Sequence, residues 1–172
     1  VDPETGLMSR MALVEALPRE VERARRYGTP LSVLMLHLDG LRAVADSYGI
    51  VVTRELMAEV GRRLPKKVRR ADLTVRFGAD VFLVLSPVDA ADATRGCERL
   101  MQAVTDEPFT AGDVQIPLAV SASTATLNVG ASVDADDDAL SLLLRAEASL
   151  PVPVVRRPAR PEGAVDPVSR RR

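Results

Sequence analysis

The sequence has no tryptophan, one cysteine and one histidine, and aromatic residues make up only 3% of its 172 residues. Because Cys97 has no partner for an internal disulfide, we expect a reducing compartment and a cytoplasmic location. No apolar run reaches the roughly 18 residues that span a bilayer, and no signal peptide is recognisable, so we expect no membrane span. With so few aromatics, the core must consist of Leu, Val, Ala and Met side chains.

The remaining composition is typical of one folded domain followed by a tail. Hydrophobic residues make up 47% and charged residues 27%, and the net charge is -1. Prolines and arginines dominate residues 151–172. We therefore expect a folded domain over residues 1–150 and an extended or disordered tail over 151–172. The tail lacks the interleaved aromatics of single-strand nucleic-acid binders, so no nucleic-acid partner is expected.

Helical and strand-like patterns alternate within residues 1–150. Helical spacing of apolar residues predicts helices over 11–27, 41–48, 51–68, 90–104 and 136–150. Apolar or alternating runs around glycine-containing turns predict strands over 31–38, 72–77, 81–85 and within 109–126. This order predicts an α/β sandwich of the α+β type, with a central, mostly antiparallel sheet flanked by helices.

Three segments occur in an order and spacing that resemble a known family. They are Asp2 to Arg10 (DPETGLMSR), Leu36 to Gly49 (LHLDGLRAVADSYG) and Arg76 to Phe82 (RFGADVF). They resemble the D-x-L-T-G-L-x-N-R opening, the D-x-D-x-F-K-x-x-N-D-x-x-G strand end and the R-Y-G-G-D-E-F signature of the GGDEF family of diguanylate cyclases. The resemblance covers about residues 1 to 150 and implies the nucleotide-cyclase-like GGDEF fold.

The resemblance implies a reaction that joins two GTP molecules with a divalent metal held by carboxylates. At the two metal positions this chain has His37 and Asp80, and a neutral imidazole is a poor Mg²⁺ ligand. In the signature, Val81 replaces an acidic catalytic residue, and Ala79 replaces a glycine that allows close substrate approach and an unusual backbone angle. We therefore expect no catalytic residue and no bound metal, with Asp80 vestigial.

The complete signature turn reads Gly78, Ala79, Asp80, Val81 and Phe82. A structural alternative for this region stays open, in which His37 is simply a packed or partly exposed residue and Asp80 stabilises its turn.

The resemblance also implies a vestigial substrate site at Asp39, Arg42, Ala45 and Arg54. Ala45 stands where the family has a guanine-binding Asn and forms no hydrogen bond with its side chain. Arg54 stands where the family has an Asp, and it presents donors where guanine N1–H and N2–H₂ need an acceptor. Arg42 stands where the family has a phosphate-contacting Lys, and it keeps the positive charge of that residue. The family's Lys after the last helix falls near Val154, among prolines.

An R-x-x-D motif lies five residues before the signature turn, as Arg69-Arg70-Ala71-Asp72. In the family, a motif at this spacing binds the product, cyclic di-GMP, and inhibits the enzyme. An Arg fork donates to guanine O6 and N7, a carboxylate accepts from N1–H and N2–H₂, and Arg70 adds positive charge for the phosphates. Arg99 is the candidate for a further arginine from the following helix, with Arg95 as second choice. The alternative is a helix-end ion pair.

The sequence therefore supports three hypotheses. The first is a catalytically inactive GGDEF domain that binds cyclic di-GMP and acts on another signalling domain or protein, with a possible homodimer. The second is a scaffold or dimerisation module that binds no nucleotide. The third is residual cyclase activity through Asp39, Asp80 and Arg42, the only case in which Mg²⁺ is expected as a cofactor.

Overall fold

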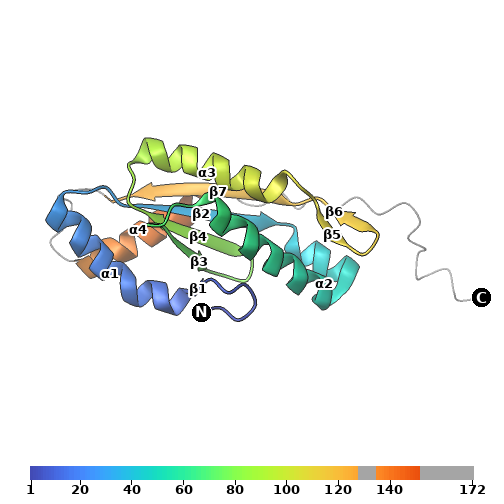
Figure 1. Cartoon of the computed structure of the whole chain (residues 1–172). Helices are drawn as coiled ribbons and strands as arrows, with labels where there is room; N and C mark the ends of the chain where they lie inside the picture. The colour runs from blue at the N-terminus through green and yellow to red at the C-terminus, as the bar shows by residue number, and fades with distance from the viewer. Residues whose placement is uncertain (128–134, 152–172) are drawn as a thin grey trace, which may run out of the picture.

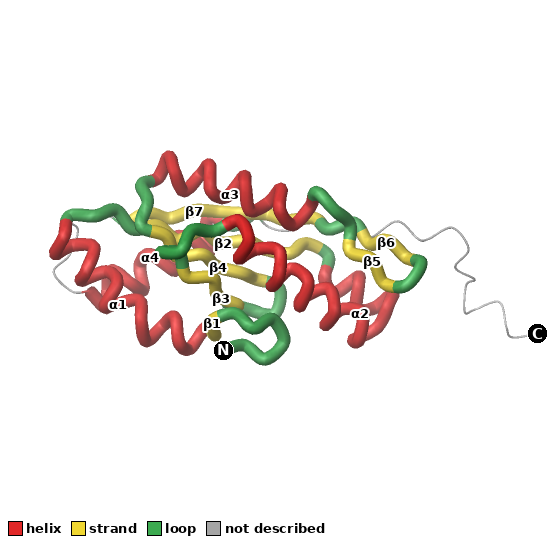
Figure 2. The backbone as a smooth tube through the Cα atoms, in the orientation of Figure 1, coloured by secondary structure: helices red, strands yellow, loops and turns green. Residues whose placement is uncertain are grey.

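The long apolar run of the sequence becomes an interior strand, next to one edge of a five-stranded sheet. The computed structural model describes residues 1–127 and 135–151. The strands follow the order β1-β3-β4-β2-β7, and every pairing is antiparallel except that of β1 with β3. Helices cover both faces, and a small hairpin, β5-β6, lies at one end (Figures 1 and 2). The predicted fold class is confirmed.

The elements have the following bounds: β1 Met8–Ser9, α1 Arg10–Tyr27, β2 Ser32–Asp39, α2 Leu41–Arg63, the 3-10 helix η1 Leu64–Lys67, β3 Leu73–Arg76, β4 Val81–Ser86, α3 Ala90–Thr105, β5 Phe109–Ala111, β6 Val114–Ile116, β7 Ala119–Thr126 and α4 Ala135–Ser149.

The two faces of β2 feed two separate hydrophobic clusters, because successive side chains of a strand point to opposite faces. Leu34 and Leu36 pack with α2 and α3 on one face. Val33 and Met35 pack with α1 and α4 on the other face. β2 is therefore buried on both sides, which explains its nearly continuous apolar sequence.

The ends of α1 follow the sequence signals. Ser9 caps the N-terminus, where its Oγ accepts a hydrogen bond from Ala12 N at 3.2 Å. Gly28 ends the helix in the left-handed conformation, with φ 62°.

The region between β2 and β3 differs from the expectation in one respect. Gly49 has the non-helical angles φ 87° and ψ 174°, so it separates the two halves of α2, as expected for separate helices there. The second half ends at Arg63 rather than Val68, and Leu64–Lys67 continues as a 3-10 helix. Pro65 explains the change, because it lacks the N–H that an α-helix would need at that position.

Strand β1 was not predicted, because its two residues form a strand only by pairing with β3, Met8 beside Val75 and Ser9 beside Arg76. The predicted tail, including the position near Val154, lies outside the described residues from residue 152 onward.

Candidate functional site

The Arg69–Asp72 turn joins η1 to β3 and is held by its own hydrogen bonds. Asp72 Oδ2 accepts a hydrogen bond from Arg69 N at 2.7 Å, and Asp72 N donates to Arg69 O at 3.0 Å. Asp72 Oδ1 accepts a third hydrogen bond from the hydroxyl of Ser86 on β4 at 2.6 Å. These contacts give the Asp72 carboxylate one orientation. A carboxylate has about four acceptor sites, so each oxygen keeps capacity for a further donor.

Helix α3 brings further charged side chains to this turn. Arg99 Nε donates to Lys67 O at 3.1 Å, which ties α3 to η1. One turn earlier, Arg95 forms an ion pair with Asp92. Gly96 lies between Arg95 and Arg99 on the helix. A Cβ at this position would lie 3.0 Å from Leu34 Cδ2, so the glycine lets α3 lie close to β2.

A cavity of about 110 Å³ lies between the turn and α3. Its lining is Leu34, Val68, Arg69, Asp72, Val84, Ser86, Val88, Asp92, Arg95, Gly96, Arg99 and Leu100. Typical ligand pockets measure roughly 300–1,000 Å³. The cavity is therefore of a size to take a single ring system, with the rest of a larger ligand outside it.

The cavity brings together most of the residues predicted for this site. Arg69, Asp72, Arg95 and Arg99 all line it, whereas Arg70 is exposed and does not. Sequence reasoning missed Ser86 and Asp92. Ser86 ends a strand in the sequence without any motif around it, and Asp92 resembles an ordinary acidic residue in the first turn of a helix.

A larger cavity, of about 460 Å³, lies between the end of α1 and strands β3 and β4. Its lining includes Leu31, Leu73, Leu85 and Pro87, and its walls expose mainly apolar surface. Its charged lining residues are Glu20 and Arg23, whereas five charged side chains line the smaller cavity. We therefore place the candidate site at the Arg69–Asp72 turn.

The single histidine lies between two carboxylates at the end of β2. Its Nδ1 lies 2.8 Å from Asp39 Oδ1, and its Nε2 lies 2.8 Å from Asp80 Oδ2. Ser121 on β7 donates to both oxygens of Asp39, at 3.0 and 2.8 Å. Burial by itself lowers the pKa of His37, but the hydrogen bonds and charges of Asp39 and Asp80 outweigh it and raise the pKa above the ordinary value of 6.5.

This arrangement does not fit the magnesium ion that the resemblance implies. Both ring nitrogens lie 2.8 Å from carboxylate oxygens, so neither is free to bind a metal. The ring also takes up the contact with Asp80 that a cation would need. No group of three or more His, Cys, Asp or Glu side chains suited to a metal occurs within the described residues.

The signature turn has ordinary backbone angles. No residue other than glycine has a positive φ in the described part of the chain, and Gly78 is not among the glycines that do. The expected backbone difficulty at Ala79 is therefore not found. Asp80 O accepts a hydrogen bond from Leu38 N at 2.8 Å, which continues the β2-β4 ladder into the turn. Val81 is half-buried opposite His37, and Phe82 is fully buried in the core.

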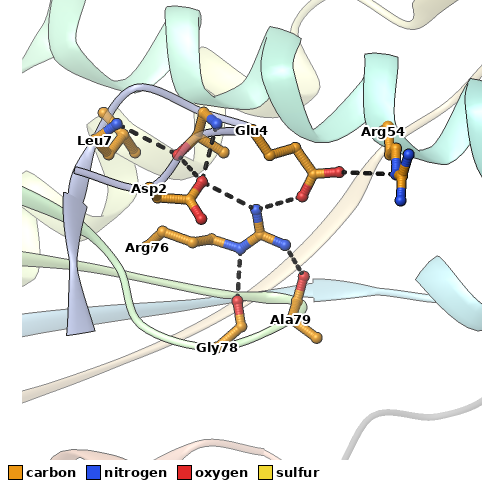
Figure 3. Close-up of polar contacts among 8 residues, drawn as sticks. Asp2, Glu4, Leu7, Arg54, Arg76, Gly78 and Ala79 are labelled. Atoms are coloured by element: carbon orange, nitrogen blue, oxygen red, sulfur yellow. Dashed lines mark hydrogen bonds and ion pairs between the residues drawn. The ribbon is translucent and has the colours of Figure 1, made fainter. Parts of the chain in front are cut away.

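Arg76 joins the signature turn to the N-terminal turn (Figure 3). Its guanidinium donates to Gly78 O and Ala79 O at 2.6 Å each, and to Glu4 Oε2 at 2.9 Å. Glu4 also lies 4.0 Å from Arg54 of α2. Sequence reasoning missed this role of Arg76 and Glu4, because the partners lie far apart along the chain.

The remaining residues of the predicted substrate site lie on α2 and are not tightly packed. Arg54 is 69% exposed in its side chain, Arg42 is exposed, and Ala45 is half-buried. Asp39 instead contacts His37 and Ser121. The structure brings Asp39, His37 and Asp80 together. Among the described residues, these three side chains share no hydrogen bond or ion pair with the predicted site residues on α2.

Comparison with known proteins identifies the family. Residues 1–150 match the family described as "Diguanylate cyclase, GGDEF domain". This chain belongs to the GGDEF family. A curated relative, the response regulator PleD of Caulobacter vibrioides, is 34% identical over 147 residues, which is 85% of this chain and 32% of that protein. The GGDEF chain thus spans about a third of that relative's length.

Solved structures of GGDEF proteins share the fold. The diguanylate cyclase SiaD of Pseudomonas aeruginosa, solved in complex with its activator SiaC, has a TM-score of 0.72 and 29% identity, covering 86% of this chain and 58% of SiaD. The GGDEF domain of DgcB from Caulobacter crescentus, solved in complex with c-di-GMP, has a TM-score of 0.77 and 20% identity, covering 86% of this chain and 83% of the DgcB chain.

Within the described residues of this GGDEF chain, every helix is too short or too polar to cross a membrane.

Proposed function

We propose that residues 1–150 form a catalytically inactive GGDEF domain that binds cyclic di-GMP at the Arg69–Asp72 turn and passes this signal to another domain or protein. The observation that carries the proposal is the cavity in which Arg69, Asp72, Arg95 and Arg99 converge. Cyclic di-GMP bound to the related DgcB domain supports the choice of ligand.

The chemistry of the cavity suits one guanine base. Arg69 offers a fork of donors to O6 and N7, and Asp72 offers acceptors to N1–H and N2–H₂. Ser86 and the Arg69 backbone hold Asp72 in place before binding, which lowers the ordering cost. Arg95 and Arg99 are exposed at the rim, where the phosphates of the ligand would lie.

The loss of catalysis is part of the proposal and rests on His37. The His37 ring lies between Asp39 and Asp80, at the position where a metal would need their carboxylates, and Val81 supplies no acidic group. Arg54 and Ala45 offer no acceptor for a guanine base. Homodimerisation stays a prediction.

The test is calorimetric titration of cyclic di-GMP into the wild type, Arg69→Ala and Arg70→Ala. Arg69→Ala keeps the backbone N–H that holds Asp72, and Arg70→Ala removes the same charge outside the cavity. We expect binding that Arg69→Ala weakens at least tenfold and Arg70→Ala changes only slightly. Equal effects of the two variants would exclude the cavity as the site. Turnover of GTP with Mg²⁺ or Mn²⁺ would refute the claim of inactivity.

A scaffold without nucleotide binding is the second candidate. It is favoured by the hydrogen bonds that the Asp72 carboxylate already makes with Arg69 N and the Ser86 hydroxyl. These bonds stabilise the turn without any ligand. If cyclic di-GMP gives the wild type neither a heat of binding nor a higher melting temperature, the scaffold is the function that stands.

A further inference from the structure

The cavity at the Arg69–Asp72 turn contains a second carboxylate that guanine recognition does not use. Asp92 lines the cavity from the first turn of α3. Its backbone N–H donates to Asp89 Oδ1 at 2.8 Å, and its Oδ1 forms an ion pair with Arg95 Nη2. The carboxylate is therefore held on the side of the cavity from which Arg95 would reach a phosphate.

We propose that Asp92 determines the ligand specificity of this cavity, by favouring guanine nucleotides with singly charged phosphodiesters over nucleotides with a triphosphate. This inference rests on the proposed function of the cavity. A bound phosphate must share Arg95 with Asp92, and it must approach the negative charge of Asp92 itself. Both costs rise with the charge of the phosphate group.

The size of the effect follows from the charges of the two ligands. Cyclic di-GMP carries about two negative charges and metal-free GTP about four at neutral pH. A carboxylate at several ångströms in partly solvated surroundings changes affinity by roughly two- to threefold for each ligand charge. Removing the charge of Asp92 should therefore improve GTP relative to cyclic di-GMP by about four- to tenfold.

The experiment measures both ligands on three proteins. A fluorescent analogue of cyclic di-GMP is displaced by unlabelled cyclic di-GMP or by GTP with EDTA, using the wild type, Asp92→Asn and Glu98→Gln. Glu98 lies on the same helix, is exposed and does not line the cavity, so its variant matches the change of charge. The cap of α3 uses the backbone N–H of residue 92, so Asp92→Asn keeps that contact.

We expect Asp92→Asn to narrow the preference for cyclic di-GMP over GTP by about four- to tenfold and Glu98→Gln to leave it unchanged. The narrowing should shrink at higher salt. An unchanged preference in Asp92→Asn, or GTP that displaces nothing from any of the proteins, would overturn the inference while the proposed function stands. Analogue binding to none of the proteins would overturn the proposed function as well.

If Asp92→Asn fails to fold by circular dichroism, Asp92→Ser replaces it. Ser keeps a polar side chain in the first turn of α3 and removes the same charge. The same two readouts then decide the inference.

Discussion

Replacing His37 by glutamine removes the imidazole that joins the end of β2 to the signature turn. The ring nitrogens lie 2.8 Å from Asp39 Oδ1 and Asp80 Oδ2, and the side chain is 15% exposed. A hydrogen bond to a charged group contributes about 1.5–3 kcal/mol when shielded. Asp80 is 40% exposed, so its share falls toward about 1 kcal/mol or less. Because glutamine keeps one donor, we expect His37→Gln to lose about 1–3 kcal/mol of unfolding free energy at pH 6.

The loss should depend on pH in a defined direction. Burial alone lowers the pKa of His37, but Asp39 and Asp80 raise it above 6.5 in the folded protein. A raised pKa stabilises the fold fully below the unfolded pKa, and this contribution disappears as the pH rises through the folded pKa. The difference in unfolding free energy between wild type and His37→Gln should therefore be largest just below about pH 6.5. It should shrink toward zero as the pH rises further.

Two measurements check this prediction. Urea denaturation of both proteins at several pH values gives the free-energy difference. NMR titration gives the folded pKa directly, and the assignment is unambiguous because the chain has one histidine. Asp80→Asn serves as the control, since it should lower that pKa. A folded pKa at or below 6.5, or a free-energy difference that does not change with pH, would refute the reasoning.

Three further predictions concern packing and reactivity. Arg76→Ala should lower the unfolding free energy by about 2–4 kcal/mol in urea denaturation, because it leaves the carbonyls of Gly78 and Ala79 and the carboxylate of Glu4 without their donor; a loss below about 0.5 kcal/mol would contradict this. Gly61→Ala should lower the melting temperature despite the better helix propensity of alanine, because the added Cβ would lie 2.8 Å from the Cβ of Thr5; a higher melting temperature would show that the N-terminal turn does not pack there. Burial raises the pKa of the Cys97 thiol to about 12, so iodoacetamide at pH 8 should label it only in denaturant, and rapid labelling of the native protein, followed by mass spectrometry, would contradict its burial.

The elements with strong local signals were predictable from the sequence. Leu31 to Leu38 is apolar at nearly every position, and a short run of this kind, ended by Asp39-Gly40, indicates a buried strand. Ser9 and Gly28 mark the two ends of α1 by their capping chemistry. β1 had no such signal, because a two-residue strand is defined only by its partner.

The candidate site was predictable only in part. Arg69 and Asp72 lie within one turn, so their spacing places them together whatever the rest of the chain does. Ser86 reaches Asp72 only because β3 and β4 pair in one register, which brings Leu73 opposite Leu85. Asp92 joins the cavity only because α3 packs against β2.

The sequence by itself determined most of the helices and strands, with β1 as an exception, and it carried the motifs by which the family is recognised. Those properties depend on neighbours within a few positions along the chain, where backbone geometry fixes the distances. Only the tertiary structure decided that His37 lies between Asp39 and Asp80, and that Arg76 joins the two turns. Asp80 and His37 are 43 positions apart, and whether charges so far apart along the chain meet at 2.8 Å depends on strand order and register. No local pattern encodes that geometry.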